Sequence, residues 1–263
     1  MCTDEAAPLP SLVARRAIVL FLADDGAEHA TKSTAFLDHV ARHGCSAGVA
    51  ASSDDDADSE AVVEDAALRS FLGLADAGAS PSLKQYHVPH VLLTTKASIS
   101  PEVHDGALCE HVALDDLPAR TRAAASEPTR NLTLVYMDRA DYTPALDATL
   151  LALVQEQPTT FFGVLQETPT LTLPSDRRLE ARTLFPLPKQ SWAKVHNTYR
   201  TDALESQRAL VYCFYAHDQV RPDTLERFEP STMLAHGGYG ILQAHAALKE
   251  IAFRLGFAPK YGA

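Results

Sequence analysis

The sequence predicts an α/β protein with an open, mainly parallel, doubly wound sheet and helices on both of its faces. Two observations indicate this class. Segments typical of strands alternate with segments typical of helices over most of the 263 residues. The strand segments are also continuous apolar runs, as expected for parallel strands buried on both faces. We expect about six or seven strands, fewer than the eight that close a (β/α)8 barrel.

The first half of the chain begins with a predicted strand over residues 16–23, an apolar run that ends before two aspartates. A helix should follow over residues 31–43, because Phe36, Leu37 and Val40 fall on one helical face. Gly44 is a typical residue at a helix end. The other elements expected in this half are strands at 47–51, 88–95 and 112–114, and a helix at 60–74 capped by Ser59.

The second half repeats the alternation. Thr143 and Pro144 predict a helix start, since a capping hydroxyl precedes proline at the first helical position. We expect helices at 117–126, 144–157 and 241–255, and strands at 132–137, 160–165 and 209–215. Residues 1–14 are interpreted as a flexible tail and 15–263 as one α/β domain. Within this domain the irregular segment 170–208 would form a lid or a small subdomain.

Charge and hydropathy exclude two classes of partner. The formal net charge is −11 and the pI is near 5.4, so nucleic acid is not an expected partner of this acidic protein. The longest apolar run, from Ala17 to Ala23, is far shorter than the ~20 residues that span a bilayer. Four cysteines without a C-x-x-C motif are typical of reduced thiols. We therefore expect a soluble protein of the cytoplasm.

Polar residues follow four of the predicted strands. Asp24 and Asp25 end the first strand, and Asp138 with Arg139 ends a later one. Glu167 follows the strand after that, and the last strand leads to His217 and Asp218. Ligands of open parallel sheets bind outside the carboxyl ends of the strands. If these strands are neighbours, the side chains should meet at one edge of the sheet.

This set of residues suggests a metal-assisted hydrolase or phosphoryl-transfer enzyme. Carboxylates suit a hard cation such as Mg²⁺ or Mn²⁺, and Asp24, Asp25, Asp138 and Asp218 are the expected ligands. His217 would act as the acid–base group, and Arg139 would bind a small anionic substrate.

Two other interpretations stay open. Aspartates are favoured helix caps, so the protein could be a non-catalytic α/β subunit that binds another protein, with residues 186–192 as the contact. Alternatively, the Gly44–Gly48 segment matches G-x-S-x-G, which would make Ser46 the nucleophile of a serine hydrolase. Against this, a predicted helix precedes the motif and a predicted strand follows it, which inverts the usual order.

Overall fold

The computed structural model describes residues 14–24, 34–51, 65–73, 82–99, 108–168, 194–195, 198–199, 208–217, 222–223 and 225–258. Asp25, Asp218 and residues 186–192 lie outside these ranges, as do the first 13 residues of the expected tail. Ala14, which closes that expected tail, is packed in the core, and its N–H donates to the carbonyl of Arg254 at 2.9 Å. Of the irregular segment, Lys194–Val195 (β7) and Thr198–Tyr199 (β8) form a small antiparallel sheet.

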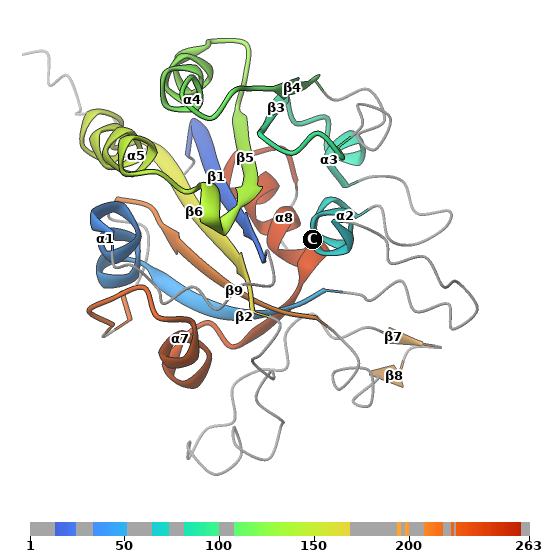
Figure 1. The fold of residues 1–263 in the computed structure, drawn as a ribbon. Coiled ribbons are helices and arrows are strands. Elements are labelled where there is room, and N and C mark those ends of the chain that lie inside the picture. Colours follow the sequence, from blue (N-terminus) through green and yellow to red (C-terminus); the bar gives the residue numbers. More distant parts are fainter. Residues whose placement is uncertain are drawn as a thin grey trace, which may run out of the picture.

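A single large sheet organises the described part of the chain (Figure 1). Its strands are β1 (Arg16–Ala23), β2 (Cys45–Ala51), β3 (His90–Thr94), β4 (Leu108–His111), β5 (Leu132–Asp138), β6 (Thr160–Glu167), β9 (Arg208–Tyr215) and β10 (Ile241–Gln243). They lie in the order β10-β2-β9-β6-β1-β5-β3-β4. Neighbouring strands pair in parallel, except that β9 runs antiparallel to both β2 and β6. The predicted open, mainly parallel sheet is confirmed. The expected number of six or seven strands is wrong, because the described residues form eight and the short strand β10 was expected to be helical.

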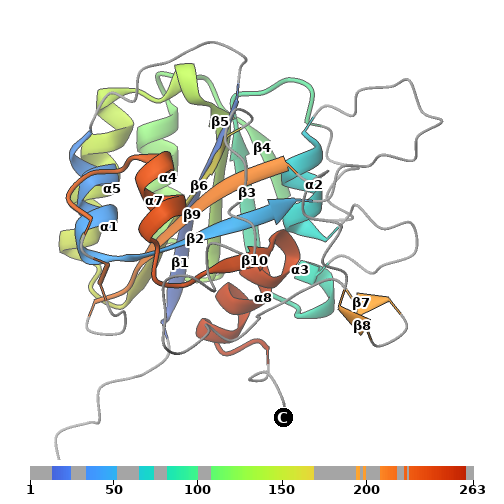
Figure 2. The same ribbon diagram turned by 90° about the horizontal axis from the view of Figure 1, so that it is seen from below.

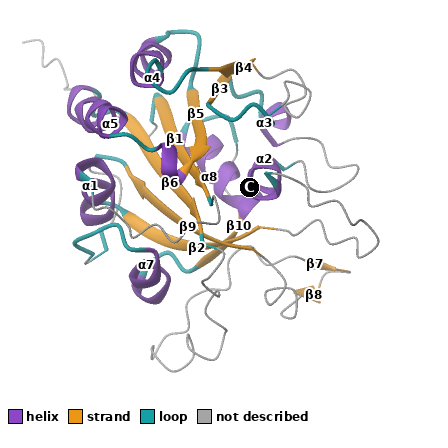
Figure 3. Cartoon of the chain, viewed as in Figure 1, coloured by secondary structure: helices purple, strands orange, loops and turns teal. Residues whose placement is uncertain are grey.

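Helices cover both faces of this sheet, as a doubly wound fold requires (Figures 1 and 2). One face carries α1 (Ala35–His43), α4 (Leu117–Ser126), α5 (Pro144–Glu156) and α7 (Pro230–His236). The other carries α2 (Ala66–Leu72), α3 (Ser82–Gln85) and α8 (Ala244–Arg254). Figure 3 shows the strands of the large sheet as one central layer between these two groups of helices.

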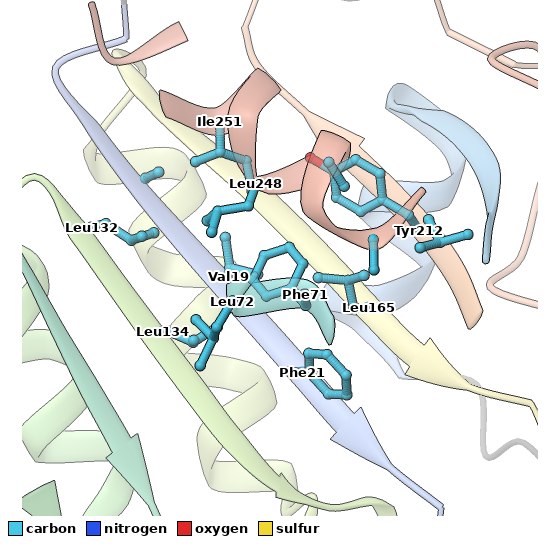
Figure 4. Packing of buried hydrophobic residues seen from close by; sticks show 14 of the residues in the cluster. Val19, Phe21, Phe71, Leu72, Leu132, Leu134, Leu165, Tyr212, Leu248 and Ile251 are labelled. Atoms are coloured by element: carbon cyan, nitrogen blue, oxygen red, sulfur yellow. The ribbon is translucent and has the colours of Figure 1, made fainter. Parts of the chain in front are cut away.

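The central strand β1 explains why the apolar runs are unbroken. Val19 and Phe21 point into the core under α2 and α8, where Figure 4 shows Phe21 near Phe71. Ile18 and Leu20 point to the opposite face and join the core under α1 and α5. Both faces are therefore packed, and every position of the strand after the first is buried. A strand in this situation has no solvent-facing positions and needs no polar alternation.

The ends of α1 and α5 follow from single residues. The hydroxyl of Thr143 accepts a hydrogen bond from the N–H of Leu146 at 3.2 Å, with Pro144 as the first helical residue. This confirms the predicted cap. After α1, a Cβ at Gly44 would lie 2.3 Å from the carbonyl oxygens of Val40 and Phe214. Gly44 is thus needed because the chain passes close to β9 there.

Two sequence predictions about elements were wrong. Residues 112–114 form no strand. The fourth strand along the chain, β4, lies immediately before them at Leu108–His111. Residues 241–243 form the short strand β10 rather than the first turn of the last helix. Their pairing with Gly48–Ala50 of β2 decides this, since the hydrogen bonds of a sheet edge outweigh a local helical pattern.

Candidate functional site

Three acidic residues lie at the carboxyl ends of the adjacent parallel strands β6, β1 and β5. Ala23 of β1 is the register partner of Asp138 on β5, and Leu22 is the partner of Gln166 on β6. Glu167 and Asp138 therefore flank the end of β1, directly before Asp24. The N–H of Asp24 donates to the carboxylate Oε2 of Glu167 at 3.2 Å. Figure 4 shows β1 and β6 side by side and pointing the same way. We call this row of strand ends the carboxyl edge.

A lysine ion pair extends the carboxyl edge toward α2. Lys96, two residues after β3, places its Nζ 2.9 Å from Asp138 Oδ1 and 3.1 Å from Asp65 Oδ1. Asp65 immediately precedes α2, and the hydroxyl of Tyr136 donates to the same Asp65 oxygen. The Lys96 ammonium also lies 5.3 Å from the centre of the Tyr136 ring. These four side chains form one connected cluster on the α2 side of the sheet.

The protonation of this cluster follows from its contacts. Partial burial works to lower the pKa of Lys96, but its hydrogen bonds to Asp138 and Asp65 outweigh this and raise the pKa. Burial raises the pKa of the Tyr136 phenol, and the hydrogen bond to Asp65 raises it further. At neutral pH, Lys96 is therefore an ammonium ion and Tyr136 is a neutral hydrogen-bond donor.

The expected four-aspartate metal site is not assembled by the described residues. Within these ranges, no group of three or more His, Cys, Asp or Glu side chains is arranged to hold a metal ion. Asp138 instead contacts the ammonium of Lys96. Asp25 and Asp218, the other two expected ligands besides Asp24, fall outside the described ranges.

His217 does not join the carboxyl edge. Because β9 runs antiparallel to β6, its last residue, Tyr215, pairs with Phe162 near the start of β6. His217 therefore lies beside the amino ends of the parallel strands, which we call the amino edge, at the opposite end of these strands from Asp24. The expected convergence is wrong for this residue, since it assumed that the last strand is parallel. Arg139, in contrast, begins a short 3-10 helix directly after Asp138 and does lie at the carboxyl edge.

Ser46 lacks the geometry of a hydrolase nucleophile. It lies inside β2 rather than on a strand-to-helix turn, and it is fully buried. Its hydroxyl donates to the sulfur of Cys213 at 3.4 Å, and its N–H donates to the carboxylate of Asp223 at 2.6 Å. The predicted elbow requires an exposed serine oxygen above the sheet. The serine-hydrolase interpretation is therefore wrong.

Sequence reasoning missed two charged residues at this end of the sheet. Asp147 lies in the apolar stripe of α5, yet its carboxylate accepts hydrogen bonds from Phe36 N–H at 3.1 Å and from Tyr142 O–H at 2.7 Å. Burial of Tyr142 holds the pKa of its phenol well above the ordinary value, and the negative charge of the Asp147 carboxylate raises this pKa further. Lys96 follows the end of β3, so the positional rule that selected Asp24 and Asp138 would also have selected it.

Comparisons with known proteins bear on the fold. No protein-family model and no curated protein sequence matches the chain. Among solved structures, the chain is similar to the PH0037 protein from Pyrococcus horikoshii, with a TM-score of 0.51, 11% identity and coverage of 95% of this chain and 100% of that one. This likeness supports the α/β fold.

Looser alignments reach two other proteins. One is the alkaline phosphatase of the Antarctic bacterium TAB5, with a TM-score of 0.44, 10% identity and coverage of 94% of this chain and 100% of that one. The other is murine ectonucleotide pyrophosphatase/phosphodiesterase 5 in complex with AMP, with a TM-score of 0.42, 10% identity and coverage of 95% and 97%. Separately, none of the described helices is long and apolar enough to cross a bilayer.

Proposed function

We propose that this protein is a hydrolase or phosphoryl-transfer enzyme that acts on a small anionic phosphoester at the carboxyl edge. One observation carries the proposal: Asp24, Asp138 and Glu167 end three adjacent parallel strands in the centre of the sheet. Ligands of open α/β sheets bind at this position.

The negative charge of the carboxylates at the carboxyl edge favours a bound cation there. Asp24 and Glu167 repel an anion, and Lys96 is already paired with Asp138 and Asp65. A bound Mg²⁺ or Mn²⁺ would supply the positive charge that attracts and polarises phosphoryl oxygens. We propose Asp24, Asp25 and Glu167 as its ligands. The guanidinium of Arg139, at the same edge, would bind the anionic group of the substrate.

Thermal melting against divalent cations tests the proposal. The wild-type protein, Asp24→Asn and the control Glu156→Gln are melted with Mg²⁺, Mn²⁺, Ca²⁺ or Zn²⁺. Glu156 ends α5 and pairs with Arg122 on the surface. A cation at 100 times its dissociation constant should add about 2.7 kcal/mol of stability to the wild type and to the control. The increase should be absent in Asp24→Asn.

Activity is then screened with 4-nitrophenyl phosphate and bis(4-nitrophenyl) phosphate in the cation that stabilises the protein. Release of nitrophenolate that is lost in Asp24→Asn but kept in Glu156→Gln would support the proposal. A melting temperature that no cation changes, together with no phosphoester turnover, would reject it.

The cluster around Lys96 favours a second candidate, a non-catalytic α/β subunit that binds another protein. Lys96 and Tyr136 already satisfy the carboxylates of Asp65 and Asp138 without a ligand. Under this alternative the carboxyl edge is a structural ion-pair network. It predicts that Asp24→Asn melts at the wild-type temperature in every cation and that no phosphoester is cleaved.

A further inference from the structure

A single ammonium group bridges two carboxylates that come from different parts of the fold. Asp65 precedes α2, whereas Asp138 ends β5, and Lys96 Nζ contacts one oxygen of each, at 3.1 and 2.9 Å. Each oxygen lies within about 1 Å of the 2.0–2.6 Å distance at which it would bind a divalent metal ion in the place of the nitrogen. The ammonium therefore occupies the position of a bridging cation.

Burial of the Asp65 carboxylate favours a cation beside it. The side chain of Asp65 is only 6% exposed, that of Lys96 is 21% exposed and that of Asp138 is 32% exposed. Removing one partner of a buried ion pair leaves an uncompensated charge, which is strongly unfavourable. Tyr136 donates a hydrogen bond to Asp65 but brings no positive charge. The buried Asp65 carboxylate therefore depends on a cation for charge compensation, and the partly exposed Asp138 carboxylate contacts the same cation.

We infer that Lys96 is the built-in counter-ion of the Asp65–Asp138 pair and keeps divalent metal ions out of that position. The pair is distinct from the cation site proposed at Asp24, Asp25 and Glu167, and the inference does not rest on phosphoester turnover. It implies that the protein needs no metal ion between β5 and α2. Removal of the Lys96 ammonium should convert the pair into a metal site.

The test is a gain of binding. Lys96→Met keeps an unbranched, apolar side chain but removes the terminal ammonium group and its charge. Titration with Mn²⁺, followed by calorimetry, should show affinity about tenfold or more above any wild-type binding, a difference of about 1.4 kcal/mol or more. Adding Asp138→Asn to Lys96→Met should abolish the gain, because one ligand is lost. Lys96→Arg keeps the positive charge and should bind Mn²⁺ no better than the wild type.

The outcomes are separable from those of the proposed function. Wild-type cation binding that disappears in Asp24→Asn concerns the other site, whereas the gain in Lys96→Met must survive in the Asp24→Asn background. If Lys96→Met is unfolded in EDTA, refolding with Mn²⁺ replaces the titration, and metal-dependent refolding supports the inference. Equal Mn²⁺ affinity in Lys96→Met and the wild type, or failure to refold in either condition, would overturn it.

Discussion

The carboxylate of Asp147 accepts a hydrogen bond from the backbone N–H of Phe36, with its two oxygens at 3.1 and 3.2 Å. This contact fixes the start of α1 against α5. A negative charge at a helix N-terminus is favourable, because the first N–H groups of the helix have no partner within it. The hydroxyl of Tyr142 donates to the same carboxylate. Asp147 therefore caps the N-terminus of α1 from a neighbouring helix, because its carboxylate accepts a hydrogen bond from a backbone N–H of the first turn.

Loss of this carboxylate should destabilise the protein. Asp147 is buried, so Asp147→Ala leaves Phe36 N–H and Tyr142 O–H without their partner, at a cost of about 2 kcal/mol or more. Urea unfolding measures the change. Asp116→Ala is the control, because Asp116 precedes α4 without a side-chain capping bond and is exposed. An equal loss in both variants would show that the Asp147 contact contributes nothing.

Gly44 is expected to tolerate no side chain. The Cβ of Gly44→Ala would lie 2.3 Å from two backbone oxygens, those of Val40 and Phe214, and neither can move without displacing α1 or β9. We expect a loss of about 2 kcal/mol or more in the free energy of unfolding. Gly163→Ala is the matched control inside β6, since its nearest neighbours are side-chain atoms at 3.3 and 3.4 Å. A loss at Gly44 no larger than at Gly163 would contradict the close approach.

His90 should make the protein less stable in acid. Burial lowers the pKa of His90 below its ordinary value of 6.5, although the hydrogen bond to the carbonyl of Val88 opposes this. Between the lowered pKa and 6.5, the unfolded chain binds a proton that the folded chain does not. Stability therefore falls as the pH is lowered through this window and is retained above it.

The variant His90→Asn isolates this contribution. Its amide can donate to Val88 in place of the ring nitrogen, which lies 2.7 Å from that carbonyl, but it does not titrate. The slope of unfolding free energy against pH below 6.5 should be smaller than in the wild type. Identical slopes would mean that His90 does not couple folding to proton binding. His39, whose pKa burial also lowers, contributes equally to both proteins and cancels in the comparison.

Ser46→Ala tests the discarded serine nucleophile directly. Its hydroxyl makes only a weak bond to Cys213 and has no exposed surface. We expect a change in unfolding free energy of no more than about 1 kcal/mol, and no change in any phosphoester turnover. Covalent labelling of the wild type by a fluorophosphonate that disappears in Ser46→Ala would reverse this conclusion.

The sequence was most informative where local patterns decide the structure. β1 and α4 begin and end at the residues predicted for them. Both elements are formed by continuous segments, so their bounds can be predicted from neighbouring residues alone. Strand direction is different. A strand buried on both faces has the same pattern whether it is parallel or antiparallel, and the long segment before β9 gives no constraint. His217 was therefore assigned to the wrong edge.

In the candidate site, too, some residues could be predicted from their place in the sequence and others depend on tertiary packing. Position after a strand was enough to identify Asp24 and Asp138 as residues of the carboxyl edge. The pairing of Lys96 with Asp65 joins residues 31 positions apart in the sequence and depends on how α2 packs against the sheet. Such contacts are set by tertiary packing and have no periodic signature along the chain.

The direction of β9 gives the sharpest functional prediction. If the carboxyl edge is the active edge, His217→Ala should leave phosphoester turnover and cation-dependent melting at wild-type values, because His217 lies at the amino edge. Asp24→Asn should abolish both, since Asp24 ends the central strand beside Glu167. Both variants are compared in the stabilising cation, with circular dichroism to confirm folding. Loss of turnover in His217→Ala with Asp24→Asn unaffected would move the active site to the amino edge and refute the proposed function as stated.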